Sequence, residues 1–258
     1  MTLRQAIAAA FAAIFVAAPA LAADKPAALK ICYDAEENYP WLMKDRPGLN
    51  IIHLQAVEKK VGAKFDMAPV PWKRCLDELK AGNYDGAFAA SFKADRLEMG
   101  NYPMKAGKVD DSRMLMLNSY SLYRAKGNAG VQWDGTKLTA AGAIGAQSGY
   151  SIIDQLKGLG ARVDDGTKSA DDNLKKLLLG GVDAVALLTQ EGDNSVATNP
   201  EFAGKIEKVS PPLVEKAYFI MLSKQFVAKY GAFSEEVWNT IGEVRESADY
   251  KAKLAAFK

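Results

Sequence analysis

The sequence predicts an α/β protein built from two lobes that are joined by a two-crossing hinge. Strand-like and helix-like segments alternate along the chain, which is typical of a parallel sheet covered by helices. The same alternation returns about a hundred residues later, which favours a second lobe of similar construction. With 258 residues, 49% of them hydrophobic, the chain can bury one large core or two modest ones.

The first 22 residues have the pattern of a signal peptide. A short basic start ending at Arg4 precedes an unbroken apolar run at 6–18, and Pro19 to Ala22 ends in a small-x-small pattern. The apolar run of about 13 residues is shorter than the roughly 20 that a membrane-spanning helix needs, which disfavours an anchor. We therefore expect cleavage after Ala22 and a periplasmic mature protein without membrane insertion.

The first lobe is expected to contain three strands that alternate with two helices. In chain order these are a strand at 29–33, a loop at 34–41, a helix at 49–61, a strand at 64–70, a helix at 72–82 and a strand at 84–88. Leu54, Val57 and Val61 form one apolar face of the first helix, and Gly62 ends it. Pro71 stands where the first turn of the second helix tolerates proline.

The second lobe repeats this order. We expect a strand at 143–146, a helix at 152–159, a short strand at 161–163, a helix that begins at 169 and a strand at 182–185. Ser169 and Asp172 have the spacing of a capping box. In both lobes a helix, a glycine, an aspartate three residues later and a small apolar strand follow one another, at 76–87 and at 174–185.

Two further segments are expected to connect the lobes. Residues 113–124 and 208–224 are strand-like, and amphipathic helices end the chain. Because lobe 1 is otherwise short, we assign residues 23–112 and 215–258 to lobe 1 and residues 113–214 to lobe 2. Two crossings make a hinge, and the cleft between the lobes is the expected ligand site.

Composition excludes several classes of function. The chain has 33 basic and 31 acidic residues, so it lacks the excess positive charge that nucleic-acid binding needs. One histidine, His53, and two cysteines cannot form a metal site rich in His or Cys, and a Ser-His-Asp triad would have to use His53. His53 lies in the first helix, where we expect an edge or solvated position. We predict no metal, no cofactor and no nucleic-acid partner.

Cys32 and Cys75 are expected to form a disulfide. An even pair in an oxidising compartment is more often a bridge than two free thiols. The alternative is two buried thiols, because cysteine is commonly interior. A catalytic thiolate is the least favoured interpretation, since neither residue has an adjacent histidine.

In the order of its motifs the chain resembles the extracellular solute-binding proteins of family 3, the polar amino-acid type that serves ABC transporters. The matching motifs are Tyr39-Pro40-Trp41, Ser91-x-x-x-x-Arg96, Gly145-Ala-Gln-Ser-Gly149, Gly181-Val-Asp183-Ala-Val185 and a return strand ending at Ser223-Lys224. They extend over nearly all of the mature chain. The resemblance implies two Rossmann-like lobes that close on a small ligand, with binding and no covalent chemistry.

The resemblance also implies which residues bind the ligand. It points to the aromatic side chains of Tyr39, Trp41 and Trp72, which offer flat apolar area; the alternative is that Trp41 and Trp72 only pack in the core. Ser91 and Arg96 match the hydroxyl and guanidinium that hold a carboxylate in the family, and the guanidinium fork suits that role. The alternative for Arg96 is a solvated side chain beside Asp95.

Lobe 2 is expected to contribute a strand-to-helix turn. The ligand-binding candidates there are Gln147, Ser148, Gly149, Tyr150 and, from the next strand end, Thr189. Free backbone N–H groups in the turn could hold an anion. Alternatively, Ser151 and Asp154 form an ordinary capping box, and both interpretations could hold together.

The chain departs from the family pattern at Leu188, where amino-acid binders usually carry an acid for the ligand ammonium. Either Glu191 or an acid of the first loop, Asp34, Glu36 or Glu37, replaces it, or the ligand is not an α-amino acid; the sequence slightly favours the latter. We expect a monomer that captures a small carboxylate-bearing ligand for an ABC permease. The alternatives are a membrane sensor as partner, or a dehydratase-like enzyme on the same fold, which would need a general acid or base.

Overall fold

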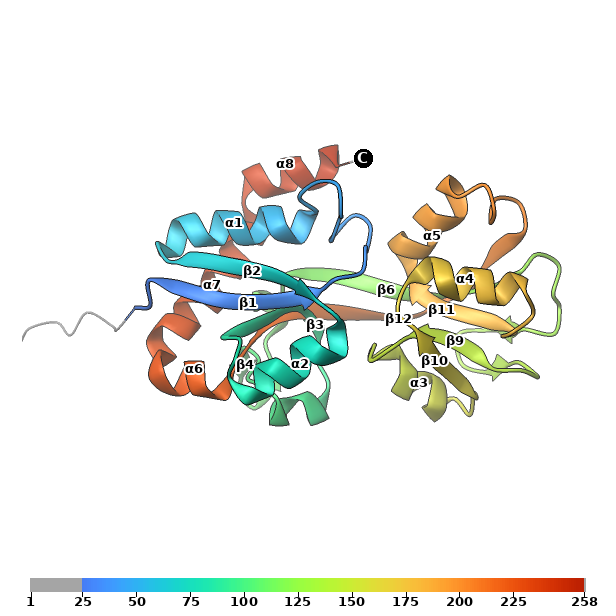
Figure 1. Cartoon of the computed structure of the whole chain (residues 1–258), viewed down its shortest axis with the longest axis horizontal. Helices are drawn as coiled ribbons and strands as arrows, with labels where there is room; N and C mark the ends of the chain where they lie inside the picture. The colour runs from blue at the N-terminus through green and yellow to red at the C-terminus, as the bar shows by residue number, and fades with distance from the viewer. Residues whose placement is uncertain (1–24, 258) are drawn as a thin grey trace, which may run out of the picture.

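The computed structural model describes residues 25–257, and the predicted signal peptide lies outside these residues. One sheet of eight strands runs through both lobes in the order β10-β9-β11-β6-β12-β3-β1-β2, and helices cover it (Figure 1). None of the helices in this part of the chain is long and apolar enough to cross a membrane.

Lobe 1 is built around three parallel strands. Its elements before the first crossing are β1 (Ala28–Asp34), α1 (Leu49–Val61), β2 (Lys64–Val70), α2 (Trp72–Ala81), β3 (Gly86–Ser91), the 3₁₀ helix η1 (Ala94–Glu98), the hairpin β4 (Met104–Lys105) and β5 (Lys108–Val109), and the 3₁₀ helix η2 (Asp111–Arg113). Strand β1 pairs in parallel with β2 on one side and with β3 on the other. The predicted bounds of α1 and β2 are confirmed, and the strand predicted at 84–88 begins and ends slightly later.

Lobe 2 has the same parallel arrangement. Its elements are the hairpin β7 (Gln132–Trp133) and β8 (Leu138–Thr139), then β9 (Ile144–Gln147), α3 (Ile152–Gly158), β10 (Val163–Thr167), α4 (Ala170–Leu178), β11 (Ala184–Leu188) and α5 (Thr189–Thr198). Strand β9 pairs in parallel with β10 and β11. Ser169 caps α4 as the predicted capping box requires, because its Oγ accepts a hydrogen bond from the backbone N–H of Asp172.

Two long strands connect the lobes. β6 (Met116–Ala125) is antiparallel to β11 in lobe 2, and β12 (Ile206–Leu222) pairs first with β6 and then with β3 of lobe 1. After β12 the chain ends in α6 (Lys224–Lys229), α7 (Gly231–Glu246) and α8 (Ala248–Ala256), all on lobe 1 (Figure 1). The predicted two-lobed α/β fold is therefore confirmed, whereas the boundaries near residues 113 and 215 stay a prediction.

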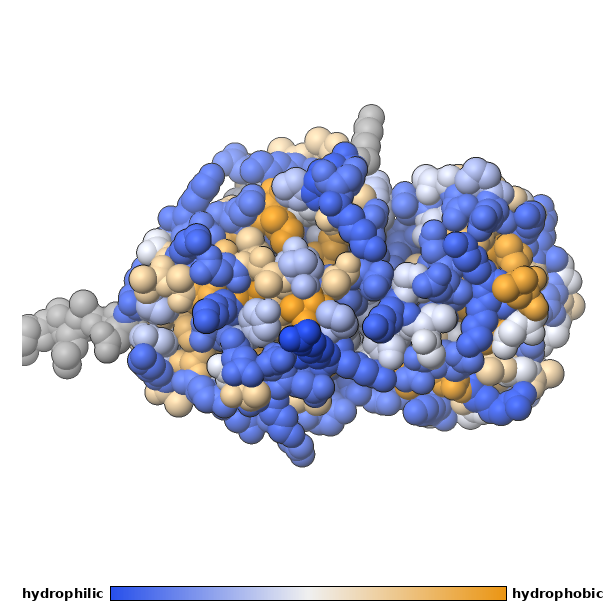
Figure 2. Space-filling view, in the orientation of Figure 1, coloured by the Kyte–Doolittle hydropathy of each residue, from blue (hydrophilic) through white to orange (hydrophobic). Residues whose placement is uncertain are grey.

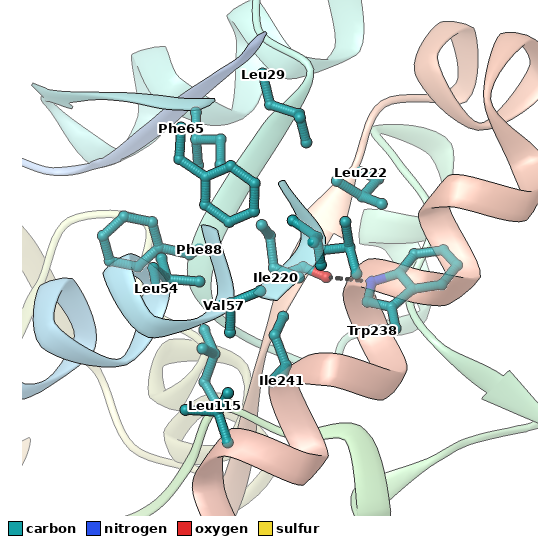
Figure 3. Close-up of a cluster of buried hydrophobic side chains, with 14 of the residues drawn as sticks. Leu29, Leu54, Val57, Phe65, Phe88, Leu115, Ile220, Leu222, Trp238 and Ile241 are labelled. Carbon is teal, nitrogen blue, oxygen red and sulfur yellow. Dashed lines mark hydrogen bonds between the residues drawn. The ribbon is translucent and has the colours of Figure 1, made fainter. Parts of the chain in front are cut away.

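The core of lobe 1 shows why the C-terminal helices return to it. Side chains from β1, α1 and β3 pack against Ile220, Leu222 and Ile241, all fully buried (Figure 3). Trp238 of α7 donates a hydrogen bond from Nε1 to the carbonyl of Ile220 on β12, at 3.0 Å. The returning helix thus covers a sheet face that would otherwise be exposed.

His53 is part of this core, so the expected edge or solvated position is wrong. The side chain is fully buried against the ring of Tyr250 on α8, and its Nε2 lies 2.9 Å from the carbonyl oxygen of Ile241. Burial is the largest of the effects that lower the pKa of His53 to about 4. The imidazole is therefore a neutral core group and lies away from the cleft.

Candidate functional site

A cavity of about 30 Å³ lies between the two lobes. It is lined by Asp34, Asn38, Leu42, Trp72, Phe88, Ala89, Ser91, Arg96, Met116, Tyr120, Tyr150, Ser151, Leu188 and Tyr218. These residues come from both lobes and from both crossing strands. A space of this size holds about two water molecules, so a larger ligand requires the lobes to part or side chains to move.

Arg96 brings a buried positive charge to the cavity. Its side chain, on η1, is 3% exposed. Nη1 donates to the carbonyl of Ser91 at 2.8 Å, and Nη2 donates across the cleft to the carbonyl of Gly149 at 3.1 Å. The guanidinium also lies over the ring of Trp72, at 5.4 Å from the centroid. The ion pairs within residues 25–257 include none to Arg96, which excludes the solvated Arg96–Asp95 pair.

Two serine hydroxyls meet beside Arg96. Ser91 Oγ, from the end of β3, donates to Ser151 Oγ of lobe 2 at 2.7 Å. Lys216 of β12 donates from Nζ to the carbonyl and the hydroxyl of Ser151, both at 3.2 Å. Burial, followed by the nearby charges of Arg96 and Lys93, lowers the pKa of Lys216. The hydroxyls are therefore surrounded by cationic groups, which suits an anion.

Ser151 stands at the N-cap position of α3, but the capping box suggested by the sequence does not form. Its hydroxyl makes no capping hydrogen bond to helix α3, because it faces Ser91 instead. The expected backbone cradle is also wrong at two positions: the N–H of Ser148 donates to the carbonyl of Thr167, and the N–H of Tyr150 donates to the carbonyl of Gln147. Lobe 2 thus reaches the cavity with side chains and with the carbonyl of Gly149.

Asp34 supplies a negative charge to the same cavity. It ends β1, is 8% exposed, and accepts a hydrogen bond from the hydroxyl of Tyr150 at 2.8 Å. Burial is the largest effect on the pKa of Asp34 and raises it, against the hydrogen bond from Tyr150, which lowers it. The cavity therefore holds an acid as well as Arg96.

Ala89 marks local strain in the cavity wall. It lies within β3 with a φ of 60°, in the left-handed region that non-glycine residues seldom adopt. The register between β12 and β3 also shifts opposite this stretch, between Phe219 and Met221. Such strain, which costs about 1–3 kcal/mol, is concentrated at functional sites in proteins.

Known structures share the fold of this chain. No protein-family model and no curated protein sequence matches the chain. Among solved structures, an ancestral arginine-binding protein bound to arginine is 18% identical with a TM-score of 0.72, covering 90% of this chain and 98% of that one. The GluR0 ligand-binding core from Nostoc punctiforme in complex with L-glutamate is 15% identical with a TM-score of 0.69, covering 89% and 98%. This chain has the fold of the type 2 periplasmic binding proteins.

A third structure with this fold is a binding protein related to an enzyme. The ancestral amino-acid-binding protein AncCDT-1, described as a precursor of cyclohexadienyl dehydratase, is 16% identical with a TM-score of 0.68, covering 90% of this chain and 96% of that one. At these identities the comparisons establish the fold, as the family resemblance of the sequence implied.

Four predicted ligand residues line the cavity: Trp72, Ser91, Arg96 and Tyr150. Trp41 does not line it; its Nε1 donates to Gln190 Oε1 of lobe 2 at 2.8 Å. Tyr39 lies in a different interlobe groove and packs near the ring of Phe257. The loop thus turns its aromatic side chains toward the lobe interface, outside the cavity.

The remaining candidates on lobe 2 have partners within the protein. Gln147 donates from Nε2 to Glu191 Oε1 at 3.0 Å, and the hydroxyl of Thr189 lies within hydrogen-bond distance of the hydroxyls of Ser119 and Ser121. Gly149 reaches the site only through its carbonyl, and Ser148 does not line the cavity.

Sequence reasoning missed the residues of the crossing strands. Met116 and Tyr120 of β6 and Tyr218 of β12 form part of the cavity wall. Side chains alternate between the faces of a strand, so Met116 and Tyr120 share one face. Recognising that both crossing strands pass the cleft would have pointed to these positions.

The structure confirms the expected disulfide between Cys32 and Cys75. Leu188, where the sequence departs from the pattern of the family that it resembles, lines the cavity. Of the proposed replacement acids only Asp34 lines the cavity, while Glu36, Glu37 and Glu191 line the other groove.

Proposed function

We propose that this chain is a periplasmic solute-binding protein that captures a small carboxylate-bearing molecule between its lobes and delivers it, as a monomer, to an ABC permease. The observation that carries the proposal is the guanidinium of Arg96, buried at the interlobe cavity without a carboxylate partner among residues 25–257. A buried charge is costly unless it is paired, so a carboxylate ligand would compensate it.

The neighbouring groups support a carboxylate. The hydroxyls of Ser91 and Ser151 are hydrogen-bonded to each other beside Arg96, and either could donate to a ligand oxygen once the lobes part. A guanidinium and hydroxyls together can donate several charge-assisted hydrogen bonds to one carboxylate. Trp72 supplies an apolar surface beside them.

Asp34 supports an amine on the same ligand. The sequence alone slightly favoured a ligand other than an α-amino acid, because Leu188 replaces the usual acid. The position of Asp34 in the cavity wall changes this balance, since its carboxylate can accept hydrogen bonds from an ammonium group. The neighbours bound to arginine and to L-glutamate support the same ligand class by analogy of fold.

The test is a thermal-shift screen with pools of amino acids, of the matching carboxylates without the amine, and of sugars. A ligand that binds only the folded protein raises the melting temperature. We expect stabilisation by the amino-acid pool. No shift with any pool, for a folded protein, would contradict the proposal.

Three variants identify the groups involved. Arg96→Gln should weaken the ligand by about thirtyfold or more, because it removes a buried charged partner. Arg74→Gln is the matched control, since Arg74 lies on α2, is largely exposed and does not line the cavity. Asp34→Asn should weaken an amine-bearing ligand more than its deaminated analogue. Equal weakening of both would exclude Asp34 as the ammonium site.

One observation favours a second candidate, a dehydratase-like enzyme on the same fold. Burial raises the pKa of Asp34 and lowers the pKa of Lys216, which brings both toward the range of proton donors and acceptors. Incubating the screened ligand with the protein and analysing the products by mass spectrometry distinguishes an enzyme from a binding protein. Loss of water from the ligand would favour the enzyme.

A permease gene beside the gene for this chain would favour transport over sensing.

A further inference from the structure

A second, larger hollow lies between the lobes and shares no lining residue with the Arg96 cavity. This outer groove has a volume of about 480 Å³ and is lined by Glu36, Glu37, Tyr39, Lys44, Ser169, Ala170, Asp171, Asp172, Glu191, Asn194, Ser195, Thr198 and Asn199. Its walls are the loop after β1, the start of α4 and helix α5 (Figure 1). The volume falls within the range of small-molecule sites.

The lining of the outer groove is strongly acidic. Five of its residues carry carboxyl groups, from both lobes, and its only basic side chain among the described residues is Lys44, which lies 3.4 Å from Glu36. The ion pairs within residues 25–257 include none to Glu37, Asp171, Asp172 or Glu191. The region where the lobes meet also has a mostly hydrophilic surface in Figure 2. Acidic side chains in the first turn of a helix such as α4 stabilise the helix dipole without any ligand, so the acidic charge alone is not evidence for a binding site.

The side chain of Glu191 gives evidence for a binding site that is independent of the acidic charge. Its side chain is 4% exposed in the wall of the outer groove. Oε1 accepts a hydrogen bond from Gln147 Nε2, but within residues 25–257 Oε2 has no hydrogen-bond partner. Gln147 Oε1 also lacks a donor. Two neighbouring side chains thus each keep a buried oxygen without a hydrogen-bond partner, which is unfavourable unless a ligand supplies one.

An ammonium group provides what these oxygens lack. It has three N–H donors and no acceptor, so it can serve Glu191 Oε2 and a second acceptor at once. A metal ion suits the groove less well: no group of three or more His, Cys, Asp or Glu side chains in the described part of the chain is placed to hold one. The other carboxyl groups are distributed over both walls, which fits a cation with separated charges. Tyr39 adds a ring face that attracts cations.

We propose that the outer groove binds a small aliphatic diamine, with one ammonium group at Glu191 and the other among the acids of the α4 start and the first loop. This site is separate from the ligand cavity and does not depend on the function proposed for it. The occupant would contact both lobes, because the walls come from both.

The experiment is calorimetric titration of the full chain at low ionic strength with 1,4-diaminobutane, 1-aminobutane and 1,4-butanediol. We expect the diamine to bind, the monoamine to bind about tenfold more weakly because it lacks one charge-assisted contact, and the diol not to bind. Equal heats from the diamine and from MgCl₂ at matched charge would indicate general screening of acidic surface and would overturn the proposal.

Variants locate the site. Glu191→Gln and Asp171→Asn should each weaken the diamine by about tenfold, and Glu37→Gln provides a third, exposed position on the opposite wall in case a buried variant fails to fold. Glu236→Gln on α7 is the matched control, outside both the groove and the cavity. Unchanged diamine affinity in the folded groove variants would overturn the proposal. So would loss of binding in Asp34→Asn alone, which would place the diamine in the Arg96 cavity.

Discussion

Tyr150 of lobe 2 donates a hydrogen bond of 2.8 Å to the carboxylate of Asp34 at the end of the first strand of lobe 1. Both side chains line the interlobe cavity. The bond therefore joins the lobes at the position where Asp34 would accept a ligand ammonium group. The Asp34 carboxylate would therefore accept hydrogen bonds both from the Tyr150 hydroxyl, which joins the lobes, and from a ligand amine.

Replacing Tyr150 with Phe should let the lobes separate more often. A hydrogen bond to a charged group contributes about 1.5–3 kcal/mol, so its loss should reduce the ratio of closed to open molecules by about tenfold or more. Small-angle X-ray scattering of the ligand-free protein would then show a larger radius of gyration. Tyr230→Phe, in a tyrosine that packs against Phe226 within lobe 1, should leave the radius unchanged. Identical scattering from Tyr150→Phe and the unaltered chain would show that this bond does not hold the lobes together.

The chain's single histidine should make the protein sensitive to mild acid. Burial lowers the pKa of His53 to about 4, below its ordinary value of 6.5. The unfolded chain therefore takes up a proton at a higher pH than the folded one, and stability falls as the pH decreases from about 6.5 toward 4. The shift corresponds to about 3 kcal/mol over this window.

The measurement is urea unfolding between pH 7 and pH 4.5, for the unaltered chain and for His53→Leu. The difference between the two curves isolates the histidine, because the carboxyl groups titrate in both. We expect His53→Leu to flatten the loss of stability on acidification, whatever its stability at neutral pH. Parallel curves would show that the imidazole is already protonated, or that it is solvated.

Local signals predicted the elements of lobe 1 well. Helix α1 is bounded by Gly48 and Gly62, and Gly62 has the positive φ that ends a helix, so its limits could be read from residue type. Strand β10 was placed too early, at 161–163, because Asp164, Asp165 and Gly166 look like a loop. As an edge strand paired only with β9, β10 needs no apolar alternation.

Some residues of the candidate site were predicted from the sequence and others were not. Ser91, Arg96 and Trp72 were predicted from the family resemblance, and they stand at the end of β3, within η1 and at the start of α2, where local sequence determines the backbone path. Trp41 and Tyr39 lie on a loop whose path depends on the opposite lobe, through contacts such as the bond from Trp41 to Gln190. Single-sequence patterns contain no information about a partner that lies 149 residues away.

Glu191 should destabilise the folded chain at neutral and higher pH. Burial is the largest effect on the pKa of Glu191 and raises it well above the ordinary value, and the charges of Asp34, Asp171 and Glu36 act in the same direction. The folded chain thus holds this proton to a higher pH than the unfolded one, so stability falls as the pH rises above about 4.5. Glu191→Gln keeps the acceptor for Gln147 and removes the titration.

We therefore expect Glu191→Gln to raise the melting temperature at pH 8 and to change it little at pH 4.5. Differential scanning calorimetry at both values measures this, with Glu236→Gln as an exposed control on α7. A melting temperature lowered at pH 8 would mean that the ionised carboxylate is stabilised in the protein. That result would favour a bound cation in the outer groove during the measurement, which added salt should then displace.

The disulfide should stabilise both the chain and the cavity wall. Cys32 lies in β1, two residues before Asp34, and Cys75 lies in the first turns of α2, three residues after Trp72. The bridge thus fixes the two elements from which an acid and an indole reach the cavity. With a sequence separation of 43 between the cysteines, the chain-entropy account gives about 4 kcal/mol of stabilisation. Replacing both cysteines with Ala should lower the urea midpoint accordingly.

The unaltered chain in the presence of dithiothreitol should show the same midpoint as the Ala variant. The variant should also bind the screened ligand more weakly under conditions where it is fully folded. An unchanged midpoint would show that the bridge is absent in solution, whereas a lower midpoint with unchanged affinity would show that packing alone positions Asp34 and Trp72.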